Sequence, residues 1–282
     1  MAAGMSSRFV PLSYEKPKAL IPVRGEILLE RQIRQLRESG IDQVIVVVGY
    51  RSEQFEYLQK HWGVTLVYNP EYATRNNNGS LYYAAEYLAN SYVCSADNYF
   101  MTSPFTTEVE DSYYAAVFSP GPTDEWCLTV DEDDRITDVT VGGQNSWYML
   151  GHTFWTDEFS QTFLQILHRI YDEPGVKDLL WEGIFQRNLS RLAMKIKRYP
   201  EDTIYEFDTL DELREFDSVY REQSGSDILT DVGRQIGCSE ASLHDLLPLK
   251  DLSGMVRGFS FNSPKGQYEY DYEKETLQEY VK

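Results

Sequence analysis

The feature that most constrains this chain is the alternation of strand and helix patterns over its first hundred residues. The aliphatic run at residues 44–48 is typical of a buried strand, whereas Leu29, Ile33 and Leu36 recur at the spacing of one helix face. The expected strands cover 43–48, 64–68 and 92–96, and the expected helices cover 26–39, 55–62 and 81–88. This order predicts a doubly wound α/β sheet, in which ligands bind beyond the carboxyl ends of the strands.

The rest of the chain departs from this alternation. Residues 126–130 and 136–141 flank an acidic turn at 131–134 and predict a hairpin. The further elements that we expect are strands at 148–155, 194–199 and 204–207 and helices at 159–171, 179–189 and 210–220. We interpret the Ser-Gly-Ser-Asp stretch at 224–227 as a linker, so that the predicted parts are a domain at 1–223 and a small C-terminal segment at 228–282.

Composition excludes several classes of protein. The chain is 42% hydrophobic, but no apolar run approaches the length of about 18 residues that a membrane helix needs, so we expect no membrane insertion. Three cysteines without disulfide or metal spacing, and the lack of a secretory signal pattern, make the cytoplasm the expected location. A net charge of -19 argues against nucleic acid as a partner, because DNA binding depends on neutralising phosphates.

One short segment is basic instead. The first forty residues carry seven Lys or Arg against four Glu, which suggests a local anion site. Small residues and two hydroxyls precede the cations Arg8 and Lys18, in the order Ala2, Ala3, Gly4, Met5, Ser6 and Ser7. Such a turn lets backbone N–H groups approach a phosphate, and cations stabilise a transferring phosphoryl group. An ordinary strand-to-helix turn with solvent-facing cations is the alternative.

The whole string is more specific than its parts. Ala-Ala-Gly-x-x-Ser-Arg followed by Lys-Pro-Lys resembles the signature of the nucleotidyltransferase superfamily, whose members make NDP-sugars and CDP-alcohols. The resemblance continues at 28–31, 49–50, 68–69, 95–97 and 204–208, and the order is most similar to the bacterial CTP:phosphocholine cytidylyltransferases. It implies a Rossmann-like mixed sheet of the nucleotide-diphospho-sugar transferase type, CTP and phosphocholine or a similar phosphorylated amino alcohol as substrates, and Mg²⁺ as cofactor.

The sequence departs from this pattern at its start. Ser6 stands where the usual turn has a second glycine, and only Met1 precedes Ala2 where relatives have a hydrophobic strand. We expect either that the true start lies upstream or that the first strand is cut short. A chain without that strand is expected to be less stable or less active, since the strand supports the phosphate loop.

The resemblance assigns roles to individual residues. Residues 2–7 would hold the triphosphate, Lys18 would stabilise the α-phosphate charge, and Arg8 would help pyrophosphate to leave. Asp97 and Asp208, each expected at a strand end, would hold the metal, although Asp208 could equally cap the helix that follows. The nucleobase would be read by Asn76, Gly79 and Ser80, with Asn78 a weaker candidate in the same run; the alternative is a helix cap.

Aromatic residues point to the acceptor. A quaternary ammonium has no N–H to donate, so proteins recognise it with aromatic faces, often beside a carboxylate. The residues that could serve are Trp126, Trp155, Trp181 and Glu182, in the part of the sequence where relatives bind their acceptor. Packing in the core is the alternative for the tryptophans. Leu180 replaces a tyrosine of the phosphocholine enzymes, which weakens the choline assignment.

In the tail, residues 259–261 and 268–272 flank a Pro-Lys-Gly turn and predict a hairpin. Residues 247–250 and 253–261 resemble the opening of bacterial choline kinase-like proteins, and because the chain ends before any kinase catalytic motif we expect an inactive remnant or fragment. Two other functions stay open for the chain as a whole. One is a sugar-1-phosphate nucleotidyltransferase, and the other is a non-catalytic nucleotide-binding module.

Overall fold

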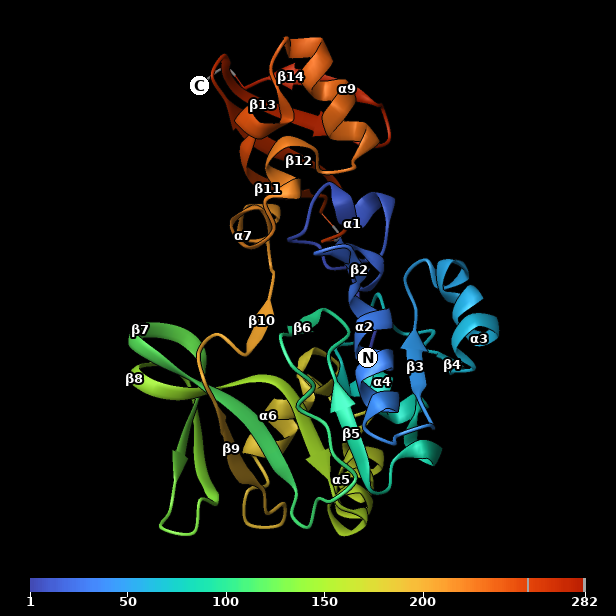
Figure 1. Ribbon diagram of the computed structural model, residues 1–282, viewed down its shortest axis with the longest axis vertical. Helices are drawn as coiled ribbons and strands as arrows, with labels where there is room; N and C mark the ends of the chain where they lie inside the picture. Colours follow the sequence, from blue (N-terminus) through green and yellow to red (C-terminus); the bar gives the residue numbers. More distant parts are fainter. Residues whose placement is uncertain (253, 281–282) are drawn as a thin grey trace. The chain divides into compact units, whose positions relative to one another are not determined.

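The computed structural model describes residues 1–252 and 254–280 (Figure 1). Its contacts divide the chain into two compact units. We call Met1–Gly4 with Leu28–Glu206 the sheet unit, and Met5–Ile27 with Phe207–Lys282 the tail unit. The chain therefore passes between the units at three places, and the N-terminal basic segment belongs largely to the unit that holds the C-terminus. The predicted linker at 224–227 lies inside the tail unit.

The sheet unit contains a mixed β-sheet, as predicted. Its four-stranded part has the order β5 (Ser91–Cys94), β8 (Ile136–Trp155), β7 (Tyr113–Val130) and β9 (Lys195–Tyr199). Only the pairing of β7 with β9 is parallel in this part. Two further pairs are β3 (Ile45–Val48) with β4 (Thr65–Tyr68), which is parallel, and β6 (Asn98–Phe100) with β10 (Ile204–Glu206), which is antiparallel. The strands predicted at 43–48, 64–68, 92–96, 194–199 and 204–207 are thus confirmed, with ends that differ by at most two residues.

Helices cover this sheet near the places that the apolar periodicity predicted, although the helix expected at 81–88 covers 78–83 instead. They are α2 (Leu28–Glu38), α3 (Tyr57–Trp62), α4 (Asn78–Tyr83), α5 (Asp157–Ile170) and α6 (Trp181–Gln186). Thr156 starts α5 by accepting a hydrogen bond from the backbone N–H of Phe159. The apolar faces of α5 and α6 pack against β8 around Trp155 and Phe163, both fully buried. This cluster is the main core of the unit.

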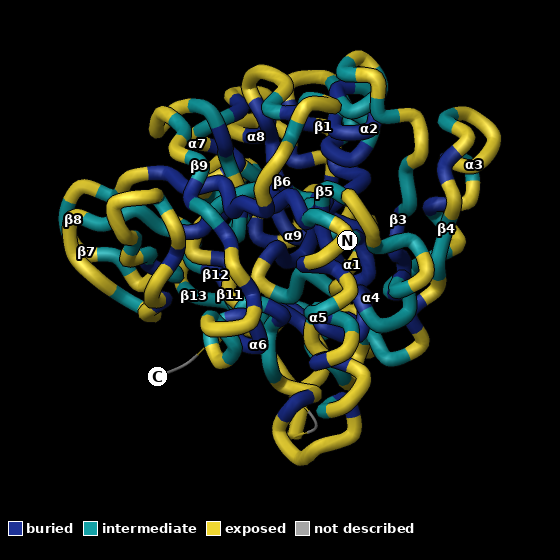
Figure 2. The backbone as a smooth tube through the Cα atoms, turned by 90° about the horizontal axis from the view of Figure 1, so that it is seen from below, coloured by how far each residue is buried: buried dark blue, intermediate teal, exposed yellow. Residues whose placement is uncertain are grey.

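The predicted hairpin is present but much longer than expected. β7 and β8 pair from Tyr113 with Phe154 out to Val130 with Ile136, interrupted by several bulges. Figure 2 shows the outer part of this hairpin largely exposed, while the first residues of β7 are buried. The alternation of exposed and half-buried positions in the outer part explains why the sequence pattern revealed only its tip.

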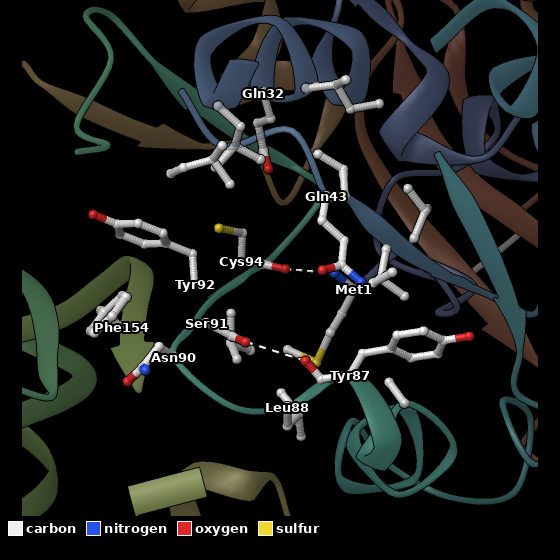
Figure 3. A pocket seen from close by; sticks show the side chains of 18 of the residues that line it. Met1, Gln32, Gln43, Tyr87, Leu88, Asn90, Ser91, Tyr92, Cys94 and Phe154 are labelled. Atoms are coloured by element: carbon white, nitrogen blue, oxygen red, sulfur yellow. Dashed lines mark hydrogen bonds between the residues drawn. The ribbon is translucent and has the colours of Figure 1, made fainter. Parts of the chain in front are cut away.

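The sheet is interrupted between β3 and β5. A cavity of about 560 Å³ lies there, and Figure 3 shows Met1, Leu88 and Tyr92 around it. At this place Ala2 forms an isolated parallel bridge with Val48. The resemblance implied a full strand here in relatives. None of the described residues that line the cavity belongs to the predicted site.

The tail unit combines short helices with a second sheet. Its helices are α1 (Leu12–Glu15), α7 (Leu210–Phe216), α8 (Val219–Glu222) and α9 (Asp227–Ile236). Its strands are the pair β1 (Pro22–Val23) and β2 (Glu26–Ile27) and the four-stranded antiparallel sheet β11 (His244–Lys250), β12 (Val256–Ser263), β13 (Gly266–Asp271) and β14 (Thr276–Glu279). The hairpin expected in the tail is β12 with β13, whereas β11 and β14 were not predicted. Ser253, part of the kinase-like string, and residues 281–282 lie outside the described residues.

The stretch predicted as a linker has a structural role. Ser226 accepts a hydrogen bond from the N–H of Leu229 and caps α9, and Ser224 bonds the carboxylate of Glu240. Both serines are buried. Capping side chains, rather than flexibility, explain the polar composition of this stretch.

Within the described part of the chain, no helix combines the length and hydrophobicity required to cross a membrane.

Candidate active site

The phosphate-loop residues of the sheet unit lie at the end of β3. The N–H of Ala2 donates to the carbonyl of Val47 at 2.8 Å, and the N–H of Tyr50 donates to the carbonyl of Ala3 at 3.0 Å. Gly49 permits this approach, because a Cβ there would lie 2.9 Å from the Ala3 carbonyl oxygen. The start of the loop is therefore fixed at the carboxyl end of a parallel strand, where α/β sheets bind ligands.

Asp97 lies in the turn between β5 and β6, beside the start of this loop. The N–H of Ala96 donates to the carbonyl of Met1 at 3.0 Å, and the Met1 ammonium donates to the carbonyl of Cys94 at 2.6 Å. Burial lowers the pKa of that ammonium, while the charges of Cys94 and Asp97 act in the opposite direction. The structure thus brings Asp97 close to the first loop residues, as the two separate motifs predicted.

A buried glutamine of α2 holds the Asp97 turn in place. The Gln32 side chain donates to the carbonyls of Ser95 and Asn98 at 2.9 and 2.8 Å. These two residues flank the turn, so the amide fixes its backbone from both sides. Asp97 itself is half-buried. The sequence did not reveal this role of Gln32, because an isolated glutamine on a helix carries no such signal.

In the tail unit, Arg8, Lys18 and Asp208 form one cluster. Arg8 Nη2 lies 2.8 Å from Asp208 Oδ1, and Lys18 Nζ lies 3.9 Å from the same oxygen. The Lys18 side chain is only 4% exposed, whereas that of Arg8 is 68% exposed. A lysine so well buried is held in one place, while the arginine can reach solvent. The alternative interpretation required both cations to face solvent, whereas only Arg8 of the two does.

The loop conformation explains a departure from the expected motif. Ser6, which replaces the usual second glycine, has φ of 47°, in the left-handed region that glycine adopts most easily. Its carbonyl accepts a hydrogen bond from the N–H of Phe9 at 2.9 Å. The loop path that glycine favours is therefore kept with serine. Met5 and Ser7 lie beside Ser6 in the same turn and are half-buried.

Asp208 does not serve as the helix cap that was its alternative role. Thr209 caps α7 by accepting a hydrogen bond from the N–H of Glu212, and Glu212 in turn accepts from the N–H of Asp208. This arrangement resembles a capping box, except that the glutamate accepts from the residue before the N-cap. The side chain of Asp208 is thereby left to its two cations, and it remains 33% exposed.

The run of asparagines is only partly open to a ligand. Asn78 and Ser80 are buried, and Ser80 Oγ accepts a hydrogen bond from Asn69. Gly79 lies close to Arg75, since a Cβ would come within 2.9 Å of its Cδ. Asn76 is exposed. Of the predicted nucleobase contacts, Asn76 is thus the one whose side chain is exposed.

Trp126, Trp181 and Glu182 come together at the start of α6. The Trp181 ring stacks on Tyr114 with a centroid distance of 5.6 Å and an interplanar angle of 10°. A Cβ added at Gly183 would lie 3.7 Å from Trp126 Cη2, so the Trp126 ring lies against the same helix. Three of the four predicted acceptor residues therefore share one location.

The carboxylate of Glu182 is held by neutral donors. It accepts hydrogen bonds from the Tyr114 hydroxyl at 3.1 Å and from Asn77 Nδ2 at 3.2 Å. Burial raises the pKa of Glu182, and the donors oppose this effect. No cationic side chain among the described residues forms an ion pair with it. The sequence analysis missed Asn77 and Tyr114, although Asn77 stands in the asparagine run already singled out.

Trp155, the fourth predicted acceptor residue, is a core residue. It is 0% exposed and contacts Phe159, Phe163 and Trp181. A ligand has no access to such a ring, and Trp181 is 1% exposed in the same core cluster, so the structure corrects the predicted roles of Trp155 and Trp181 to packing. A sequence pattern does not tell a packing tryptophan from one that binds a ligand. Burial in the structure distinguishes the two roles.

Residues for a divalent cation are limited to carboxylates. Among residues 1–252 and 254–280, no group of three or more His, Cys, Asp or Glu could hold a metal on its own. Asp97 and Asp208 offer the oxygen ligands that Mg²⁺ prefers, and Mg²⁺ sites commonly use one or two carboxylates together with substrate phosphates. The donors therefore fit a cation that binds together with a triphosphate.

Comparison with known proteins gives a consistent result. Residues 1–179 match the MobA-like NTP transferase domain. The chain is 34% identical to choline-phosphate cytidylyltransferase of Streptococcus pneumoniae, covering 79% of this chain and 98% of that protein. It is 31% identical to 2-aminoethylphosphonate cytidylyltransferase of Lancefieldella rimae, covering 78% and 91%.

Solved structures agree with the fold. That of CTP:phosphocholine cytidylyltransferase from Streptococcus pneumoniae matches with a TM-score of 0.74 and 35% identity, over 77% of this chain and 96% of that one. A putative glucose-1-phosphate thymidylyltransferase from Bacillus anthracis shares the fold at 15% identity, with a TM-score of 0.62 over 78% and 93% of the two chains.

Proposed function

This chain belongs to the MobA-like NTP transferase family, and we propose that it transfers CMP from CTP to phosphocholine, giving CDP-choline and pyrophosphate. The relative from Streptococcus pneumoniae, named choline-phosphate cytidylyltransferase, is similar over nearly its whole length. Because both substrates are intracellular phosphates, we also propose a cytoplasmic location.

One observation carries the choice of acceptor. The carboxylate of Glu182 has neutral hydrogen-bond donors but no cationic partner among the described residues, and the half-buried ring of Trp126 lies against the same helix. A half-buried negative charge of this kind favours a cationic ligand, and a quaternary ammonium suits aromatic faces. A sugar phosphate would instead need several polar side chains to bind its hydroxyls. The site therefore favours phosphocholine over a sugar-1-phosphate.

The reaction needs little more than positioning and charge. An oxygen of the acceptor phosphate attacks the α-phosphorus of CTP in line, a new P–O bond forms, and the bond to the β-phosphate breaks to release pyrophosphate. A phosphate dianion is already a nucleophile, so no general base is required. Backbone N–H groups of residues 2–7 would hold the triphosphate, Lys18 would stabilise the α-phosphate, and Arg8 would stabilise the departing pyrophosphate.

We assign the metal ligands to Asp97 and Asp208. Mg²⁺, when bound, neutralises phosphate charge and orients the triphosphate. In the absence of substrate, Asp208 keeps Arg8 and Lys18 close to each other by binding both.

The nucleobase is assigned to the asparagine run. Asn76 has its side chain exposed, and its carbonyl oxygen accepts a hydrogen bond from the N–H of Asn77. An amide held in this way can present a donor to a pyrimidine. Gly79 and Ser80 stay predicted contacts of the nucleobase, but both are buried and their N–H groups donate to the carbonyls of Asn76 and Asn77. Buried Asn78 is left with a structural role.

A panel of substrates tests the proposal. The four nucleoside triphosphates are each combined with phosphocholine, phosphoethanolamine, 2-aminoethylphosphonate and glucose-1-phosphate, and pyrophosphate release is measured. We expect release with CTP and phosphocholine above all other pairs. Preference for 2-aminoethylphosphonate would assign a primary ammonium acceptor, and preference for glucose-1-phosphate would overturn the acceptor assignment. Release from no pair would favour the non-catalytic nucleotide-binding module.

The kinase-like resemblance of the tail remains a separate prediction. The described part of the tail unit forms the β12–β13 hairpin in the expected region. We propose that it is a remnant without kinase activity. Formation of ADP from ATP and choline by the purified chain would contradict this.

A further inference from the structure

We propose that Asn77 is a positioning residue that sets the affinity for the acceptor, by holding Glu182 and the first turn of α6 against the loop that binds the nucleobase. The inference rests on the proposed function, since it concerns the acceptor site of that reaction. The asparagine run was predicted to contact only the nucleobase, so this role adds a second one.

All three asparagines of the run bond to one segment. Six hydrogen bonds among the described residues join residues 76–78 to residues 176–182, which lead into α6. The N–H of Asn76 donates to the carbonyl of Lys177 at 2.8 Å, and Asn78 Nδ2 donates to the carbonyl of Val176 at 3.0 Å. The nucleobase loop and the approach to the acceptor helix are therefore one bonded structure.

Asn77 makes the two bonds that reach the acceptor residues. Its Oδ1 accepts from the N–H of Trp181 at 2.7 Å, and its Nδ2 donates to Glu182 Oε2 at 3.2 Å. The first N–H groups of a helix have no partner within the helix, so the amide oxygen supplies one. A carboxamide provides the donor and the acceptor at once. Aspartate would keep the bond to Trp181 but place a second negative charge beside Glu182.

The donated bond also affects the charge of Glu182. Burial raises the pKa of this carboxyl group, and the bonds from Asn77 and Tyr114 counteract that rise by stabilising the ionised form. Tyr114 faces it from β7 and Asn77 from the loop before α4, and no further titratable group contributes to its pKa. Removal of either donor would raise the pKa of Glu182 further, and a protonated carboxyl group does not attract an ammonium.

Steady-state kinetics of Asn77→Ala test the inference. We expect KM for phosphocholine to rise about tenfold or more, as for a lost hydrogen bond to a charged group, with KM for CTP within about twofold of wild type. The acidic limb of the pH profile of kcat/KM for phosphocholine should move to higher pH. A packing role alone would not shift that limb.

Two further variants complete the experiment. Tyr114→Phe removes the other donor without touching the asparagine run, and it should shift the acidic limb in the same direction, so the inference stays testable even if Asn77→Ala fails to fold. Asn188→Ala is the matched control, because Asn188 Nδ2 donates, among the described residues, only to the carbonyl of Ile184 at the other end of α6. It should leave both KM values and the pH profile unchanged.

The outcomes separate the inference from the proposed function. Equal changes in KM for both substrates, or an unmoved acidic limb in Asn77→Ala and Tyr114→Phe, would overturn the positioning role while wild-type activity stands. Absence of wild-type activity with CTP and phosphocholine would instead overturn the proposed function itself.

Discussion

Glu182 of the sheet unit and Asp208 of the tail unit are carboxylates in opposite surroundings. Glu182 accepts bonds from a neutral amide and a neutral hydroxyl, and burial raises its pKa. Asp208 lies within ion-pair distance of Arg8 and Lys18. Burial thus disfavours the charge of Glu182 and a cationic ligand would compensate for this, whereas Asp208 shares its charge with two cations that would bind an anionic ligand. Surroundings, rather than residue type, assign the two roles.

His152, another group of the sheet unit, resembles Glu182 because burial favours its neutral form. His152 is 1% exposed, and its Nε2 lies 3.0 Å from the Tyr113 hydroxyl among aromatic rings. Burial, with a smaller contribution from Lys197, lowers the pKa of His152 to about 3. In the tail unit, by contrast, Asp271 has its pKa lowered by the Lys274 N–H and by the charges of Lys274 and Arg257.

The largest expected effect comes from the ion-paired carboxylate. Asp208→Asn keeps the shape of the side chain but removes the charge that would bind Mg²⁺, and kcat should fall at least about a hundredfold. Asp97→Asn should do the same. Thermal unfolding should show an intact fold, since Thr209 rather than Asp208 caps α7 and Asp97 is only half-buried. Near-normal kinetics in Asp97→Asn would contradict the metal assignment.

The cations themselves come next. Lys18→Gln removes a buried positive charge from the proposed transition state and should lower kcat by about a hundredfold. Lys16→Gln is the matched control, because Lys16 is exposed and close in sequence. If the two variants behaved alike in pyrophosphate release, Lys18 would have no specific role.

Stability should depend on pH through His152. Its pKa is depressed in the folded state, so below about 6.5 the unfolded chain binds a proton that the folded chain does not. The free energy of unfolding is therefore about 2 kcal/mol lower at pH 5 than at pH 8. His152→Gln, which retains an acceptor for Tyr113, should flatten that part of the dependence in urea denaturation. Exposed His168→Gln should leave it unchanged, and an equal response of the two variants would argue against burial as the cause.

The smallest effect tests the carboxylate held by neutral donors. Glu182→Gln should raise KM for phosphocholine about tenfold. With 3,3-dimethylbutyl phosphate, in which carbon replaces the quaternary nitrogen, the same substitution should have almost no effect. Equal losses with both acceptors would show that Glu182 acts through shape rather than charge, and the comparison with Asp208 would fail.

Local patterns predicted most of the elements but not their extent. The period of apolar residues located α2, α5 and β3, because one buried face repeats at helix or strand spacing. The predicted helix at 210–220 is instead two helices, α7 and α8. Asp217 lies between them, and its side chain accepts a hydrogen bond from the N–H of Arg24. Contacts between residues so distant in sequence leave no local pattern.

The amino-acid sequence by itself determined the family, the mixed α/β class and the residue types at the phosphate loop, because these depend on short motifs and on apolar periodicity. Only the tertiary structure decided that Trp155 is core, that Thr209 rather than Asp208 caps α7, and that Asn77 holds Glu182. Each of these depends on burial or on a partner far along the chain. A side chain's chemistry is written in the sequence, but its solvent access and its hydrogen-bond partners are settled only when distant segments pack together.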